Sequence, residues 1–85
     1  MTAEARRARD VGEALRDGAA HRQADRPAEA RDAWRRALAF DPGNAEAEAG
    51  LAWAEPELRR MQAKAAAAEE ELRRSQQVSR VLTRW

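Results

Sequence analysis

Apolar side chains in this sequence recur every three or four positions rather than at every second position. A spacing of three to four residues places side chains on one face of an α-helix, whereas a half-buried strand needs strict alternation. The pattern is interrupted at three points, and each interruption contains a proline. It predicts an all-α chain without strands, with helices near residues 3–24, 28–40, 45–54 and 57–84.

Turn-forming residues separate the first three predicted helices. Pro27 suits the first position of a helix, where its missing N–H needs no partner. Asp41-Pro42 ends the second helix, because proline lacks the N–H donor and biases the preceding residue away from helical geometry. Gly43 supplies a turn, and Asn44 is a good N-cap for the third helix. Since a very short turn joins the first two helices, we expect them to pack antiparallel.

Pro56 falls inside the next helical stretch. Either the helix ends near Ala54 and restarts with Pro56 in its first turn, or one long helix kinks there. We expect a break or a sharp kink. Nothing after Pro56 would stop a helix. The sequence therefore predicts a helical repeat region at residues 1–55 and a long amphipathic C-terminal helix at residues 56–85.

The same spacing predicts which face of each hairpin helix points inward. On the first helix the shared face carries Ala8, Val11, Leu15, Gly18 and Ala19. On the second helix it carries Ala30, Ala33, Trp34, Ala37 and Phe40. We expect Trp34 to be the buried centre of the hairpin.

The stretch AEARDAWRRALAFDPGN at residues 28–44 combines small, aromatic and turn residues in a fixed order. Written as A-x3-W-x2-A-L-x-F-D-P-x-N, it closely resembles the second helix and exit turn of a tetratricopeptide repeat. The resemblance extends roughly from Val11 to Ala52. It gives packing roles to five residues, which are Gly18, Ala30 and Ala37 (small), Trp34 (large aromatic) and Pro42 (terminal proline).

Resemblance to this family implies a helical hairpin that binds other proteins. One repeat with a partial second leaves faces uncovered, since about three or more repeats are generally needed for stability. The C-terminal helix could cap the repeat, a second copy could supply the missing surface, or a larger complex could hold it. We expect a homo-oligomer or a subunit of a larger complex.

Composition narrows the functional classes. Eighty-five residues make one small domain at most, and a net charge of +1 gives no overall field that selects nucleic acid. The N-terminus lacks the apolar core of a signal peptide, and no apolar run reaches the ~20 residues that span a bilayer, so we expect a cytoplasmic protein. Leu, Val and Phe together supply only ten residues, which predicts a thin core and an oligomeric or marginally stable chain.

Catalytic side chains are scarce. The sequence has one histidine and neither cysteine nor tyrosine, so nucleophilic triads and zinc sites are unsupported. Glu69, Glu70 and Glu71 point about 100° apart on a helix and cannot converge on one metal ion. We therefore expect no enzyme, no cofactor and no metal. His21 is interpreted as a surface or groove residue with a role in partner contact.

The C-terminal helix carries two apolar stripes, rotated by roughly a third of a turn from each other. The first stripe consists of Leu58, Met61, Ala65, Ala68 and Leu72. The second consists of Val78, Val81, Leu82 and Trp85, beside the basic Arg80 and Arg84. One flat surface cannot bury both, so we expect the first stripe to pack on the repeat. The second stripe, with its terminal tryptophan, is predicted to contact a partner.

These observations favour a non-enzymatic protein–protein interaction module, a small adaptor or accessory subunit. The alternative is a peripheral membrane or acidic-surface binder, in which Trp85 lies at headgroup depth with Arg80 and Arg84 toward anionic groups. Nucleic-acid binding is disfavoured, because the chain lacks a stacking platform and a basic face beyond its tail.

Overall fold

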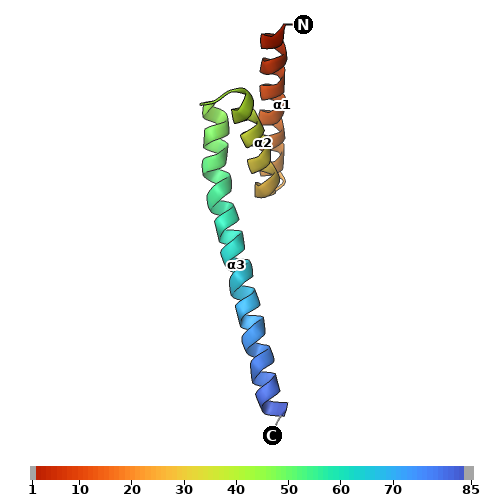
Figure 1. Ribbon diagram of the computed structural model, residues 1–85, viewed down its shortest axis with the longest axis vertical. Helices are drawn as coiled ribbons and strands as arrows, with labels where there is room; N and C mark the ends of the chain where they lie inside the picture. The colour runs from red at the N-terminus through yellow and green to blue at the C-terminus, as the bar shows by residue number, and fades with distance from the viewer. Residues whose placement is uncertain (1, 84–85) are drawn as a thin grey trace.

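Three α-helices follow one another along the chain, with α1 at Ala3–Gln23, α2 at Pro27–Phe40 and α3 at Ala45–Thr83 (Figure 1). The computed structural model describes the backbone of residues 2–83 and the side chains of residues 2–78. Within these residues there is no strand, which confirms the all-α prediction. α1 and α2 form an antiparallel hairpin, and α3 runs back along α2 before continuing far past it (Figure 1).

A Schellman motif makes the turn between α1 and α2. Arg26 N–H donates to the His21 carbonyl at 2.8 Å, and Asp25 N–H donates to the Arg22 carbonyl at 3.0 Å. Asp25 adopts a φ of 57°, in the left-handed region that aspartate tolerates better than most residues. Pro27 occupies the start of α2, as its missing N–H predicts, and is buried there.

The side-chain amide of Asn44 stabilises the turn between α2 and α3 through both its oxygen and its nitrogen. Its Oδ1 accepts a hydrogen bond from the Ala47 N–H at 3.0 Å, which is the geometry of an N-cap. Its Nδ2 donates to the Asp41 carboxylate at 3.0 Å. Gly43 reverses the chain with a φ of 84°. The predicted N-cap is therefore confirmed.

The core is built mainly from alanine. Its buried members are Ala14, Ala30, Ala33, Trp34, Ala37, Ala47 and Ala54, with Leu15, Leu38, Leu51 and Trp53 partly buried against them. Among the described side chains, Trp34 is the one large residue that is buried, and only 3% of it is exposed. Its predicted position at the centre of the hairpin is confirmed. The small alanines allow the three helix backbones to approach one another closely around this single indole.

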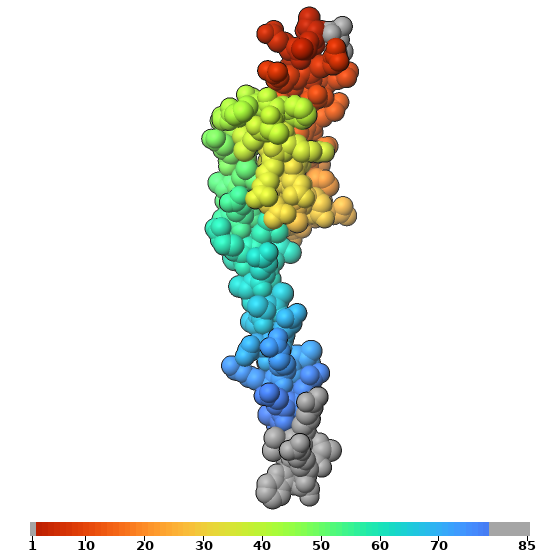
Figure 2. Space-filling view, in the orientation of Figure 1, coloured from red at the N-terminus to blue at the C-terminus, as the bar shows by residue number. Residues whose placement is uncertain are grey.

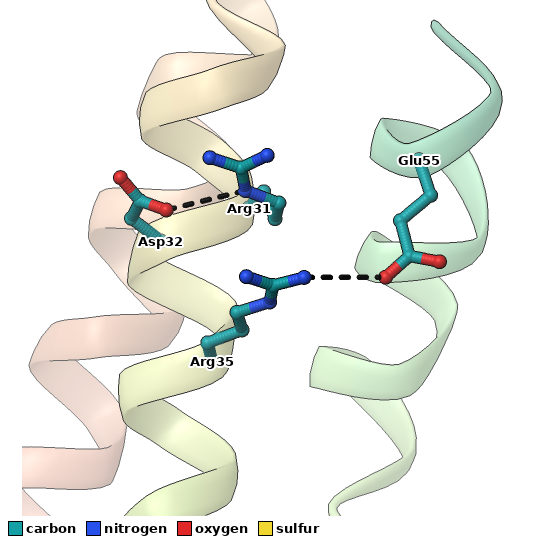
Figure 3. A network of polar contacts seen from close by, with 4 residues as sticks. All are labelled: Arg31, Asp32, Arg35 and Glu55. Carbon is teal, nitrogen blue, oxygen red and sulfur yellow. Dashed lines mark hydrogen bonds and ion pairs between the residues drawn. The ribbon is translucent and has the colours of Figure 1, made fainter. Parts of the chain in front are cut away.

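Two ion pairs join α2 to its neighbours at the surface. Arg36 Nη2 lies 2.8 Å from the Asp17 carboxylate of α1, and Arg35 Nη2 lies 3.9 Å from the Glu55 carboxylate of α3. Figure 3 shows Arg35 reaching across the gap between α2 and α3 to Glu55. All four side chains are about half exposed, so each pair contributes at most ~1 kcal/mol.

The expected break at Pro56 is wrong, because α3 continues through this residue as one helix. An internal proline removes one backbone hydrogen bond, here the one to the Ala52 carbonyl. Ala52 is exposed, so water can reach that carbonyl. Alanine, glutamate, leucine and arginine on both sides are strong helix formers, which favours continuation over a restart. Pro56 therefore lies inside a 39-residue rod.

Phe40 was expected to face inward, and this expectation is also wrong. It is 43% exposed. Phe40 is the last residue of α2, and the hollow beside its ring is lined by residues of α1 and of the turn that follows α2. The ring borders a shallow hollow with Ala8 and Val11 of α1. A helical face is buried only as far as a neighbouring element extends beside it.

Candidate binding surfaces

Trp34 fixes how closely α1 and α3 approach α2. A Cβ atom added at Gly18 of α1 would lie 2.4 Å from the indole Nε1 of Trp34. A Cβ added at Gly50 of α3 would lie 2.3 Å from the same ring. Real Cβ atoms do not approach so closely, so only glycine fits at either position. The indole is thus held between two glycine backbones. The role of Gly18 was predictable from the family resemblance, whereas that of Gly50 was not.

Trp53 extends this cluster toward the surface. Its ring centroid lies 6.2 Å from that of Trp34, at an interplanar angle of 86°, which is an edge-to-face pair. The Arg22 guanidinium lies 4.8 Å from the centre of the Trp53 ring, within cation–π range. Sequence reasoning did not single out Trp53 or Arg22. The sequence does contain a hint, since Trp53 comes three residues after Gly50 and the two therefore lie on adjacent turns of one helix.

An open groove of about 480 Å³ lies between α1 and α3 over this cluster. It is lined by Ala19, Arg22, Gln23, Trp34, Glu46, Ala49 and Gly50. Ala19, Ala49 and Gly50 contribute small side chains to this lining, and Arg22 and Glu46 add opposite charges. His21, predicted as a partner contact, is half-buried on α1 and is not among the lining residues. Its predicted role stays a prediction.

A second surface lies on the part of α3 that projects beyond the hairpin. We name it the α3 stripe, and it consists of Leu58, Met61, Ala65, Ala68 and Leu72. The expectation that this stripe packs on the repeat is wrong beyond Leu58, because Met61 is 54% and Leu72 is 61% exposed. Ala65 and Ala68 are exposed as well. Figure 2 shows this part of the chain as a column only one helix wide.

The length of α2 explains why the α3 stripe is uncovered. α2 has 14 residues and α3 has 39, so α2 covers only the beginning of α3. Trp34 of α2 lies level with Gly50 of α3. α2 begins at Pro27, seven residues before Trp34. Because the two helices are antiparallel, the start of α2 lies level with a position about seven residues after Gly50, near residue 57. Upstream of this point, Ala47 and Ala54 on the same face are buried. Downstream the face continues without a neighbouring helix.

The predicted C-terminal contact surface falls mostly outside the described residues. Val78 is 58% exposed, which agrees with an accessible position. Five further residues of the prediction have side chains outside the described part, namely Arg80, Val81, Leu82, Arg84 and Trp85. Their role stays a prediction.

Among residues 2–78, no three His, Asp or Glu side chains gather closely enough to hold a metal ion. No described helix is both long enough and apolar enough to cross a membrane. Comparison of the chain with protein-family models, with curated proteins and with solved structures finds no match.

Proposed function

We propose that this chain is a non-enzymatic protein–protein interaction module, a small tetratricopeptide-like adaptor or an assembly subunit of a homo-oligomer or larger complex. The observation that carries the proposal is the α3 stripe. Met61 and Leu72 each expose more than half of a large apolar side chain on a helix that has no neighbour there. Taking a fully exposed side chain of this size out of water contributes about 1.5–3 kcal/mol, and covering the exposed part of each by another protein contributes a share of this.

The shape of the molecule supports the same proposal. The chain extends 76 Å in one direction and 20 Å in the other two. Amphipathic helices commonly bind other proteins through their apolar face, with anchor side chains at three- and four-residue spacing. The part of α3 beyond the hairpin has this form. The packed hairpin then serves to anchor one end of this helix.

A photo-crosslinking amino acid at position 61 tests the proposal in the cells that express the protein. We expect covalent adducts with protein, because Met61 would lie inside the contact. The matched control places the same group at Ala63, which is also exposed but about 200° around the helix. Adducts with lipid alone, or equal yields of protein adducts at the two positions, would contradict the proposal.

A further inference from the structure

The surface of α3 that receives Trp34 recurs farther along the same helix. Trp34 lies against Gly50, and the residues around Gly50 in the same core cluster are Ala47, Leu51 and Ala54. Four residues at i, i+3, i+4 and i+7 form a hole that accepts a side chain from a neighbouring helix. Eighteen positions later, five turns at ~3.6 residues per turn, the equivalent residues are Ala65, Ala68, Glu69 and Leu72. All four are exposed, so among the described residues only the first hole is filled.

We propose that the second hole, formed by Ala65, Ala68, Glu69 and Leu72, receives one large apolar side chain from an amphipathic helix of another protein, which carries basic residues on both edges beside that side chain. This inference rests on the proposed function and specifies the partner of the α3 stripe. The second hole lies on the same face as the packed interface between α2 and α3, and it continues that interface beyond the start of α2.

A partner helix at the second hole has room beside α2. The start of α2 lies level with about residue 57, and residue 68 lies eleven positions farther along α3, which is ~16 Å. A helix centred on the second hole can therefore extend about ten residues toward the hairpin before it meets α2. Met61 lies within this stretch, so the same partner helix covers it.

The second hole is shallower than the first, which limits the side chain that it can accept. Ala68 stands in the position of Gly50, and Leu72 stands in that of Ala54. A Cβ atom at Gly50 would lie 2.3 Å from the Trp34 ring, so an indole inserted equally deeply at Ala68 would clash. The side chain that fits is a narrower aliphatic one, such as leucine or methionine.

The charges around the second hole specify the edges of the partner helix. Glu69 and Glu71 lie on opposite sides of Leu72, about 60° and 100° around the helix from it. Neither carboxylate forms an ion pair with another described side chain, whereas Glu70 pairs with Arg74 on the far side of the rod. A basic residue on each edge of the partner helix complements these two carboxylates.

Two cations lie farther from the second hole on the same two sides. Lys64 comes seven positions before Glu71, and Arg73 comes four positions after Glu69. Acidic residues about one turn before and after the anchor of the partner helix complement them. The partner pattern is therefore an aliphatic anchor with basic residues beside it and acidic residues farther out.

Filling the second hole tests the pairing, with the photo-crosslinking group at position 61 as the readout. Ala68→Phe places a ring where the partner side chain would insert, so the yield of protein adducts should fall about tenfold or more. Ala67→Phe is the matched control, because it adds the same ring about 140° from the centre of the α3 stripe and should leave the yield nearly unchanged. Equal yields from the two variants, or a higher yield from Ala68→Phe, overturn the inference.

Charge reversal tests the basic edges of the partner. The double variant Glu69→Lys, Glu71→Lys places two cations against them, so we expect about a tenfold or greater loss of adducts at position 61. Glu70→Lys is the control, because it lies on the far side of the rod and should keep the yield. An undiminished yield in the double variant, or an equal loss in the control, overturns the assigned charges of the partner.

Mass spectrometry of the adducts at position 61 identifies the attached segment. We expect a helical segment of another protein in which leucine or methionine has lysine or arginine within one turn on both edges. Attachment to a second copy of this chain, or to a segment without this pattern, overturns the inference and leaves the proposed function standing. If the unsubstituted chain gives no protein adducts at position 61, the proposed function fails as well.

Discussion

Residues 45–58 and 59–78 belong to the same helix, yet the apolar face of the first is buried and that of the second is exposed. In the first segment, Ala47 and Ala54 are buried against α2. In the second, Ala65 and Ala68 occupy the same face and are exposed. The residue types and the spacing are alike in both segments. What differs is whether a second helix lies alongside, which shows that amphipathic pattern alone does not determine burial.

The two segments also owe their helical structure to different forces. The first is held by tertiary contacts around Trp34, including the close approach of Gly50. Every residue of the second is exposed, so this segment depends on helix propensity, on extension from an already nucleated helix, and on local pairs. Glu70 and Arg74, at i and i+4, are an example of such a pair, with Arg74 Nη2 3.7 Å from Glu70 Oε1.

Among these substitutions, Trp34→Ala should produce the largest difference in stability between the two segments of α3. It removes the only large side chain that is buried among residues 2–78, and is expected to destabilise the packed unit by about 3–5 kcal/mol. Urea unfolding followed by far-UV circular dichroism should show loss of the hairpin, with part of the α3 helicity retained. An unchanged unfolding midpoint would show that the indole is not the centre of the core.

Gly50→Ala tests the same contact with a smaller change. The added methyl group would lie 2.3 Å from the Trp34 ring, so we expect a loss of about 1–3 kcal/mol through overpacking. Gly12→Ala is the control, because its nearest neighbour is the end of the Arg16 side chain at 3.5 Å. That substitution should be stabilising by roughly 0.5–1 kcal/mol, since alanine is the better helix former. Thermal unfolding of both variants provides the comparison.

Leu72→Ala should have the smallest effect on the stability of the monomer. Leu72 is 61% exposed and lies beyond the reach of α2, so the change in unfolding free energy is expected to stay within about 0.5 kcal/mol. The measurement requires dilute protein, where any association is negligible. A loss of several kcal/mol under these conditions would mean that the rod folds back onto the hairpin.

Local sequence signals predicted the ends of the helices well. Pro27 at the start of α2 and Asn44 before α3 act through hydrogen bonds to residues nearby in the chain, and such bonds can be inferred from sequence. The burial of Trp34 was also predictable, because it lies between small residues on one helical face. Pro56 was misjudged, since one missing hydrogen bond was given more weight than the strong helix formers on both sides.

The contact between Arg22 and Trp53 could not be predicted, because the two residues come from different helices. Arg22 of α1 lies over Trp53 of α3, and the family resemblance gave a packing role to neither residue. Their contact depends on how α1 and α3 are arranged around α2. The role of Gly50 could not be predicted for the same reason, since it depends on the Trp34 indole of another helix.

The sequence by itself determined the all-α class, the turns before α2 and α3, and the spacing of the apolar positions, because these depend on interactions within a few residues. Only the tertiary structure decided which stretches of those faces are covered. The deciding quantity is the difference between the 14 residues of α2 and the 39 residues of α3. Burial requires a neighbouring surface of matching length, and the apolar stripe from Met61 to Leu72 extends beyond the one that the chain provides.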